Sequence, residues 1–152
     1  MSYIRSVLQP DEHIVMIGKL HWIVYARTIF FLLAGIVLVI AEEHYLPNDV
    51  LISATAIAFS VAFLASFVHA WFIRWITEFG VTNRRVIYKR GFITRHTAEM
   101  NMDKVESVDV DQSLLGSILG YGTIHVLGTG QGIEYLHRIA APLALRNAII
   151  AK

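Results

Sequence analysis

Two long apolar runs separated by a short polar turn constrain this chain more than any other feature. Residues 22–41 contain one charged residue, Arg27, and residues 50–73 contain none apart from a histidine. At about 1.5 Å of rise per residue, helices over these runs would be roughly 30 and 36 Å long, enough to cross a bilayer core of about 30 Å. The pattern therefore predicts a transmembrane helical hairpin over residues 22–74. Two buried helices of a soluble protein, or a cleaved signal sequence, are the alternatives.

The composition of the chain agrees with a small domain attached to a membrane anchor. Charged residues make up 16% of the 152 residues, whereas a soluble domain carries about 25%. The chain has no cysteine, which excludes a disulfide scaffold and a cysteine-ligated metal site. A formal net charge of +1 does not favour a nucleic-acid partner.

The basic residues predict the orientation of the hairpin. The turn over residues 42–49 has neither lysine nor arginine, whereas basic residues flank the outer ends of both runs. Because loops rich in lysine and arginine stay in the cytoplasm, the turn is expected outside and both termini inside. Residues 1–21 are then a cytoplasmic N-terminal segment, and residues 75–152 are a cytoplasmic domain.

The second half of the chain has the pattern of short strands closed by a helix. Alternating or β-branched segments cover residues 75–82, 85–90, 105–110, 123–127 and 133–139, with turn-forming residues between them. Pro142 suits the first turn of a final helix. These segments predict a small antiparallel barrel or sandwich with a capping helix at its C-terminal end.

Several motifs, in this order, resemble the bacterial pleckstrin-homology-like membrane protein family. The similar segments are residues 8–12, 21–22, 78–87, 91, 102–108, 112–116, 119–124 and 128–130. The resemblance implies an α+β membrane protein in which a two-helix transmembrane hairpin is followed by a PH-like antiparallel β-barrel with a C-terminal capping helix. It also implies the bacterial cytoplasmic (inner) membrane as the location, and it implies little about activity. Ser117 stands where a basic residue would be expected.

Four basic residues are candidates for contact with anionic lipid: Arg84, Arg85, Lys89 and Arg90. Near an acidic inner leaflet, each would contribute about 1 kcal/mol of attraction. Adjacent residues of a strand point to opposite faces, so this spacing does not reproduce a headgroup clamp. We therefore interpret the group as a docking surface, with a specific phosphate site as the alternative.

Two apolar patterns are candidates for contact with a partner. One lies between two predicted strands and comprises Leu114, Leu115, Ile118, Leu119 and Tyr121; it predicts either a short helix packed on the domain or an exposed patch for the bilayer or a partner subunit. The other is a row of small residues at every fourth position of the second run, namely Ala54, Ala58, Ala62 and Ser66, where another helix could approach closely.

The sequence offers no catalytic or metal-ligating constellation. Its seven histidines show no ligand spacing, and no nucleophile has a recognisable base. We therefore expect no cofactor and a non-catalytic two-pass membrane protein, acting as a scaffold, assembly element or accessory subunit of a membrane complex. The expected partners are the lipid bilayer and either further copies of the chain or a larger membrane protein complex. A module that senses a lipid headgroup or small ligand is the alternative.

Overall fold

A computed structural model describes residues 3–46, 48–91, 96–129 and 133–151. The chain divides into two compact units. One is Trp22–Arg74, here called the helix pair, and the other combines Met1–His21 with Trp75–Lys152 and is called the β domain.

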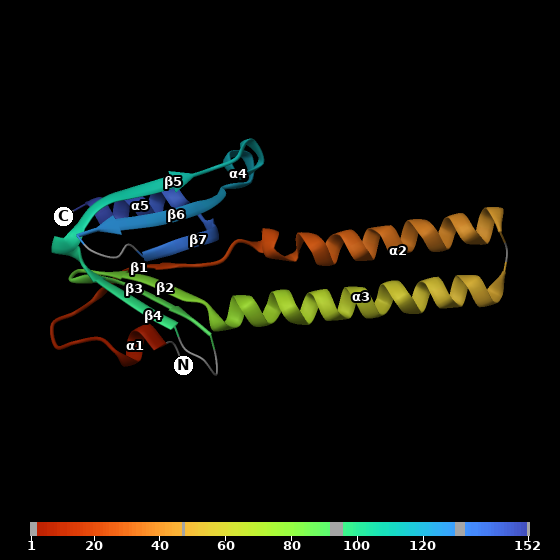
Figure 1. Cartoon of the computed structure of the whole chain (residues 1–152), viewed down its shortest axis with the longest axis horizontal. Coiled ribbons are helices and arrows are strands. Elements are labelled where there is room, and N and C mark those ends of the chain that lie inside the picture. Colours follow the sequence, from red (N-terminus) through yellow and green to blue (C-terminus); the bar gives the residue numbers. More distant parts are fainter. Residues whose placement is uncertain (1–2, 47, 92–95, 130–132, 152) are drawn as a thin grey trace. The chain divides into compact units, whose positions relative to one another are not determined.

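The helix pair consists of α2, Ala26–Tyr45, and α3, Asp49–Ile76, whose last two residues belong to the β domain (Figure 1). A 3₁₀ turn, Trp22–Tyr25, precedes α2, so this helix begins later than the predicted residue 22. It also extends past residue 41 into the polar segment, where the Glu42 carboxylate accepts a hydrogen bond of 2.9 Å from the Thr55 hydroxyl of α3. Both helices are long and apolar enough to cross a membrane.

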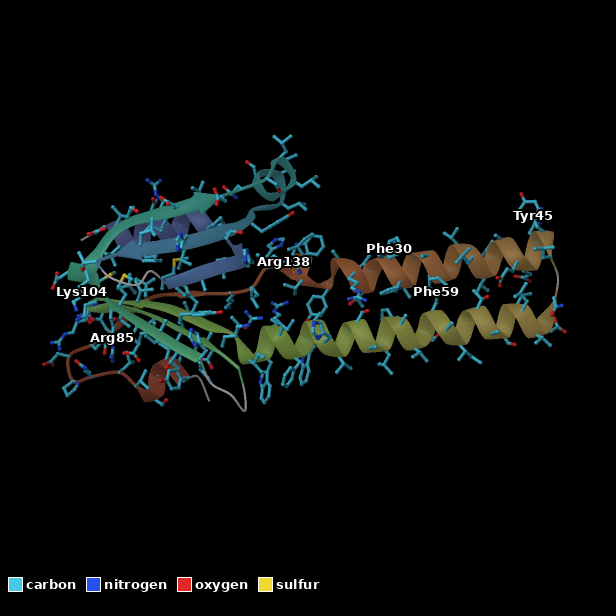
Figure 2. All side chains as sticks on the ribbon, in the orientation of Figure 1. Phe30, Tyr45, Phe59, Arg85, Lys104 and Arg138 are labelled. Atoms are coloured by element: carbon cyan, nitrogen blue, oxygen red, sulfur yellow. The ribbon has the colours of Figure 1, made fainter. Side chains whose placement is uncertain are left out.

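The two helices are antiparallel and approach closely at a glycine. A Cβ atom on Gly35 of α2 would lie 2.8 Å from Cβ of Phe59 on α3, so only a residue without a side chain fits there. Towards the ends of the pair that join the β domain, the rings of Tyr25 and Phe67 lie 5.8 Å apart. Large apolar side chains such as Phe30 remain exposed along the pair (Figure 2).

The β domain has two antiparallel sheets. The first sheet has the order β1-β2-β3-β4, with β1 at Ile14–Gly18, β2 at Glu78–Thr82, β3 at Arg85–Arg90 and β4 at His96–Asn101. The second has the order β5-β6-β7, with β5 at Val105–Asp111, β6 at Tyr121–Gly128 and β7 at Ile133–Ala140. The short helices of the β domain are α1 (Tyr3–Ser6), η2 (Met102–Lys104) and α4 (Leu114–Leu119), and its final helix is α5 (Pro142–Ile150).

The core of the β domain lies between the two sheets. Phe79, Val86 and Ile124 are among its fully buried side chains. Helix α5 contacts strands of both sheets and adds Leu145 and Ile149 to this core. A helix therefore begins at Pro142 and caps the two layers, as the sequence predicts.

The described strands form two sheets and no closed barrel. On one side, Leu20, two residues after β1, forms an isolated bridge with Ile139 of β7. On the other side, the chain passes from β4 to β5 through η2, a 3₁₀ turn, and no ladder between these two strands is observed in the described ranges. The turn sends β5 into the second layer, so the architecture is a sandwich, the other form that the sequence allows.

The N-terminal segment is part of the β domain. Strand β1 pairs with β2, with Gly18 opposite Phe79 and Ile17 opposite Gly80, although the whole helix pair lies between these two strands in the sequence. The division based on sequence had separated residues 1–21 from a domain over residues 75–152, because no local pattern indicates this pairing. The helix pair is thus inserted between two neighbouring strands of one sheet.

Candidate functional site

A tight turn shapes the segment before β1, residues 3–13, which we call the N-terminal arm. The Glu12 N–H donates to the Gln9 carbonyl at 3.0 Å, and Asp11 has a φ of 65°. Proline at the second position and a positive φ at the third are typical of a type II turn, and Pro10 and Asp11 occupy these positions. This turn accounts for the motif at residues 8–12.

The arm is held by the turn between β2 and β3. The Asn83 side-chain oxygen accepts from the His13 N–H at 3.0 Å, and the Asn83 N–H donates to the His13 carbonyl at 3.2 Å. The Thr82 hydroxyl donates to Glu12 at 2.7 Å and accepts from the backbone N–H groups of Arg84 and Arg85. The Thr-Asn-Arg-Arg motif therefore docks the arm as well as turning the chain.

The centre of this contact is a bidentate ion pair between Glu12 and Arg85 (Arg85 is labelled in Figure 2). Arg85 Nε and Nη2 each lie 2.9 Å from a different Glu12 carboxylate oxygen. Arg85 also donates to Glu99 and to the Val7 carbonyl, both at 2.7 Å. The Glu12 side chain is fully buried, and that of Arg85 is 13% exposed.

The surroundings of Glu12 keep its carboxyl group ionised. Burial alone would raise its pKa, but hydrogen bonds from Arg85, the Gln9 N–H and Thr82, together with the charge of Arg85, lower the pKa to about 2. The hydrogen bond with Glu12 likewise raises the pKa of Arg85. Both groups are therefore charged at every physiological pH.

This lowered pKa predicts that the β domain loses stability in acid. Because the folded-state pKa of Glu12 lies near 2 and the unfolded value near 4.3, its contribution is complete above about pH 5 and is lost as the pH falls towards 2. The loss is about 3 kcal/mol for this group. Urea unfolding of the wild type and of Glu12→Gln across this range measures it. If the free energy of unfolding changes with pH as steeply in the variant as in the wild type, the assignment of this loss to Glu12 is contradicted.

The four basic candidates do not form one site. Arg84 and Arg85 lie at the turn that starts β3, whereas Lys89 and Arg90 are its last residues. At about 3.3 Å per residue, the two ends of this strand are roughly 16 Å apart. The charge of Arg85 is used within the domain, and Arg84 is exposed.

The other pair of basic candidates lies beside the first helix. The Lys89 ammonium lies 5.1 Å from the centre of the Tyr3 ring of α1, a cation–π contact. Arg90 is exposed. At this end of β3, both charges lie at the surface of the β domain, and the two side chains do not form a common binding site.

A polar cleft of about 470 Å³ lies beside the arm contact. Its lining combines amides, two guanidinium groups and a carboxylate, namely Gln9, Asn83, Arg84, Arg85, Asn101, Met102 and Asp103. The carboxylate of Asp103 and the pairing of Arg85 with Glu12 offset the positive charge, so the cleft does not have the character of a phosphate pocket.

The apolar candidates at residues 114–119 form α4 and are exposed. Leu114 and Ile118 are 87% and 80% exposed, and Leu115 and Leu119 are also exposed. Tyr121 begins β6 and is partly buried. The structure therefore has the short helix of the first predicted alternative, but with the exposed apolar side chains of the second.

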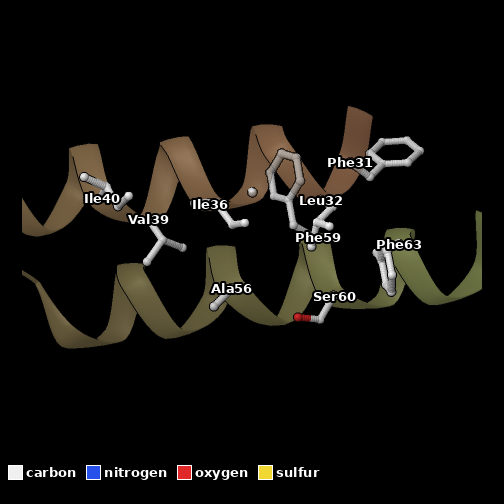
Figure 3. A pocket seen from close by; sticks show the side chains of 10 residues that line it. Phe31, Leu32, Ile36, Val39, Ile40, Ala56, Phe59, Ser60 and Phe63 are labelled. Carbon is white, nitrogen blue, oxygen red and sulfur yellow. The ribbon is translucent and has the colours of Figure 1, made fainter. Parts of the chain in front are cut away.

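The row of small residues on α3 follows two different surfaces. Ala54 and Ala58 are exposed, whereas Ala62 and Ser66 are half-buried. Every fourth residue advances by about 40° around a helix, so such a row turns away from its starting face. Beside it, an open apolar pocket of about 320 Å³ lies between α2 and α3, around Gly35, Ala56 and Phe63 (Figure 3).

Sequence reasoning did not identify Glu12 and Glu99 as partners of the basic turn. Glu12 is 73 positions from Arg85, and only the family-like lead-in at residues 8–12 marks it. Among the residues that the structure describes, no group of three histidine or acidic side chains could hold a metal ion.

Comparisons with known proteins identify one related family. A family model described as bacterial PH domain matches residues 14–151. The match runs from the start of β1 to the end of α5 and includes the helix pair. No curated protein and no solved structure matches the chain.

Proposed function

Because the chain belongs to the bacterial PH domain family, we propose that it is a non-catalytic two-pass membrane protein whose β domain lies at the cytoplasmic face of the membrane. There it serves as a scaffold or accessory subunit, in a homo-oligomer or a larger membrane complex. The helix pair anchors the domain in the bacterial inner membrane.

The pairing of β1 with β2 is the observation that carries this proposal. Gly18 and Phe79 are direct neighbours in the sheet, so the chain leaves and re-enters the β domain at adjacent positions. The inserted segment must then begin and end on the same side of a membrane. Two helices of spanning length satisfy this requirement, and their exposed apolar side chains match lipid better than water.

The use of Arg85 favours a scaffold over a headgroup sensor. Arg85, one of the four residues of the predicted docking group, is bound by Glu12 and Glu99, so its charge acts in the fold. Exposed basic residues at the surface are sufficient for a general attraction to an anionic leaflet.

The topology is tested with reporter fusions and extraction. We expect a cytoplasmic reporter to be active after residue 152, a periplasmic reporter to be active only when it is inserted at residue 48, and the protein to resist carbonate extraction. A C-terminal fusion that is active only in the periplasm, or a protein released by carbonate, would refute the topology.

The scaffold role is tested by purification in mild detergent and native mass spectrometry in lipid discs. We expect a homo-oligomer or a complex with another membrane protein. Ala58→Leu, on the exposed part of the α3 row, should weaken that assembly, whereas Ile57→Leu, at an exposed residue outside the row, should leave it unchanged. A lone monomer without any copurifying protein would remove the scaffold role.

A further inference from the structure

Helix α4 presents one apolar face. Leu114 and Leu115 are followed four residues later by Ile118 and Leu119, and residues four apart lie on the same side of a helix. All four side chains are exposed, Leu114 at 87%. Each Å² of apolar surface that stays in water costs about 25 cal/mol relative to burying it.

The helix is fixed in place, so its exposure does not result from a loose loop. The Ser113 hydroxyl caps the N-terminus by accepting from the Gly116 N–H at 3.0 Å, and Gly120 ends the helix in the left-handed conformation. The Gln112 side chain donates to the Tyr121 carbonyl at 3.0 Å. Gly116 lies so close to this carbonyl that a Cβ would be 2.7 Å from it.

Within the β domain, α4 lies next to the point where the chain leaves for the helix pair. The ring of Tyr121, at the base of α4, stacks on His21 with 5.3 Å between ring centres. The His21 N–H donates to the Arg138 carbonyl at 2.7 Å, and Leu20 pairs with Ile139. The register of β6 with β7 places Tyr121 opposite Ala140, at the same end of the domain.

The same end of the domain carries more basic than acidic side chains. Its basic residues are Lys19, Lys89, Arg90 and Arg138, and its acidic residues are Glu78 and Asp111. The Glu78 carboxylate accepts from the Ile4 N–H at 3.4 Å. An apolar helix among basic residues is typical of a surface that enters an anionic membrane interface.

We propose that α4 inserts its apolar face into the bilayer that holds the helix pair, as a third point of membrane contact. This inference rests on the proposed function. A helix of six residues is about 9 Å long. It presents far less surface than the about 800 Å² per partner of a stable protein interface, so lipid fits it better than a second copy.

Fluorescent labels on single cysteines test this placement. Since the chain has no cysteine, Ile118→Cys, Lys104→Cys and Val37→Cys each provide one labelling site in the full-length protein. The labelled proteins are reconstituted into vesicles of phosphatidylethanolamine and phosphatidylglycerol with a nitroxide lipid. We expect at least about twofold stronger lipid quenching at position 118 than at position 104, and a blue-shifted emission.

The controls separate the outcomes. Lys104 is exposed at the opposite end of the β domain, near Arg85 (Figure 2), and Val37 is an exposed residue of α2. Quenching at position 37 but not at 118 overturns the role of α4 and leaves the proposed function intact. Protection of position 118 from aqueous iodide without lipid quenching indicates a protein contact and also overturns it. Absence of quenching at position 37 overturns the membrane anchor itself.

Discussion

Replacing Arg85 by alanine is expected to reduce the free energy of unfolding of the β domain by roughly 3–5 kcal/mol. The substitution leaves the Glu12 carboxylate fully buried without its bidentate partner. It also removes the hydrogen bond to the Val7 carbonyl, which helps to hold the arm. Hydrogen exchange of the β2 and β3 amides, measured on the full chain in detergent, reports this loss separately from the helix pair.

The neighbouring arginine is a matched control. Arg84→Ala also removes one positive charge, but from the neighbouring residue, whose side chain is exposed. Surface changes of this kind usually cost less than about 0.5 kcal/mol of stability. Equal protection of the β2 and β3 amides in the two variants would contradict the structural role of the ion pair. A lipid-binding role for Arg85 alone predicts unchanged exchange in both.

The helix pair and most strands follow from local sequence patterns. The long apolar runs indicate the helices, although α2 continues beyond its run to polar residues such as Glu42, whose carboxylate accepts a hydrogen bond from Thr55 of α3. The expected strand at residues 85–90 is β3. Expected strands at 105–110 and 123–127 correspond to β5 and β6, which extend by one to three residues.

The arm contact could not be predicted because its partners are far apart in the sequence. Neither the polar Glu12 nor its separation of 73 residues from Arg85 produces a periodic signal. The four basic candidates illustrate the same limit: they are close in sequence, but their two pairs lie at opposite ends of β3. For α4, the apolar residues are visible in the sequence, but only the fold shows that their side chains are exposed on the β domain.

The second large effect concerns the boundaries of the β domain. Residues 75–152 expressed alone are expected not to fold cooperatively, because they lack β1, the buried Ile4 and the Glu12 partner of Arg85. A chain in which a short glycine-serine linker replaces residues 22–74 is expected to fold. Gly18 and Phe79 are already paired, so the ends at residues 21 and 75 lie only three and four residues beyond a paired position. A linker of about six residues, with a reach of roughly 13 Å, is therefore chosen to join them.

Urea unfolding followed by circular dichroism compares the two proteins. The linked chain should show one cooperative transition, whereas the isolated fragment should show none, because the edge of β2 is left unpaired and Arg85 loses its bidentate partner Glu12. Removing residues 1–13 from the linked chain keeps β1 but deletes the N-terminal arm, so this variant measures the arm alone. If the isolated fragment unfolds at the same urea concentration as the linked chain, the N-terminal segment is an appendage and the helix pair merely precedes a complete domain. The expected difference instead makes the helix pair an insertion, whose two ends are joined to adjacent strands of one sheet.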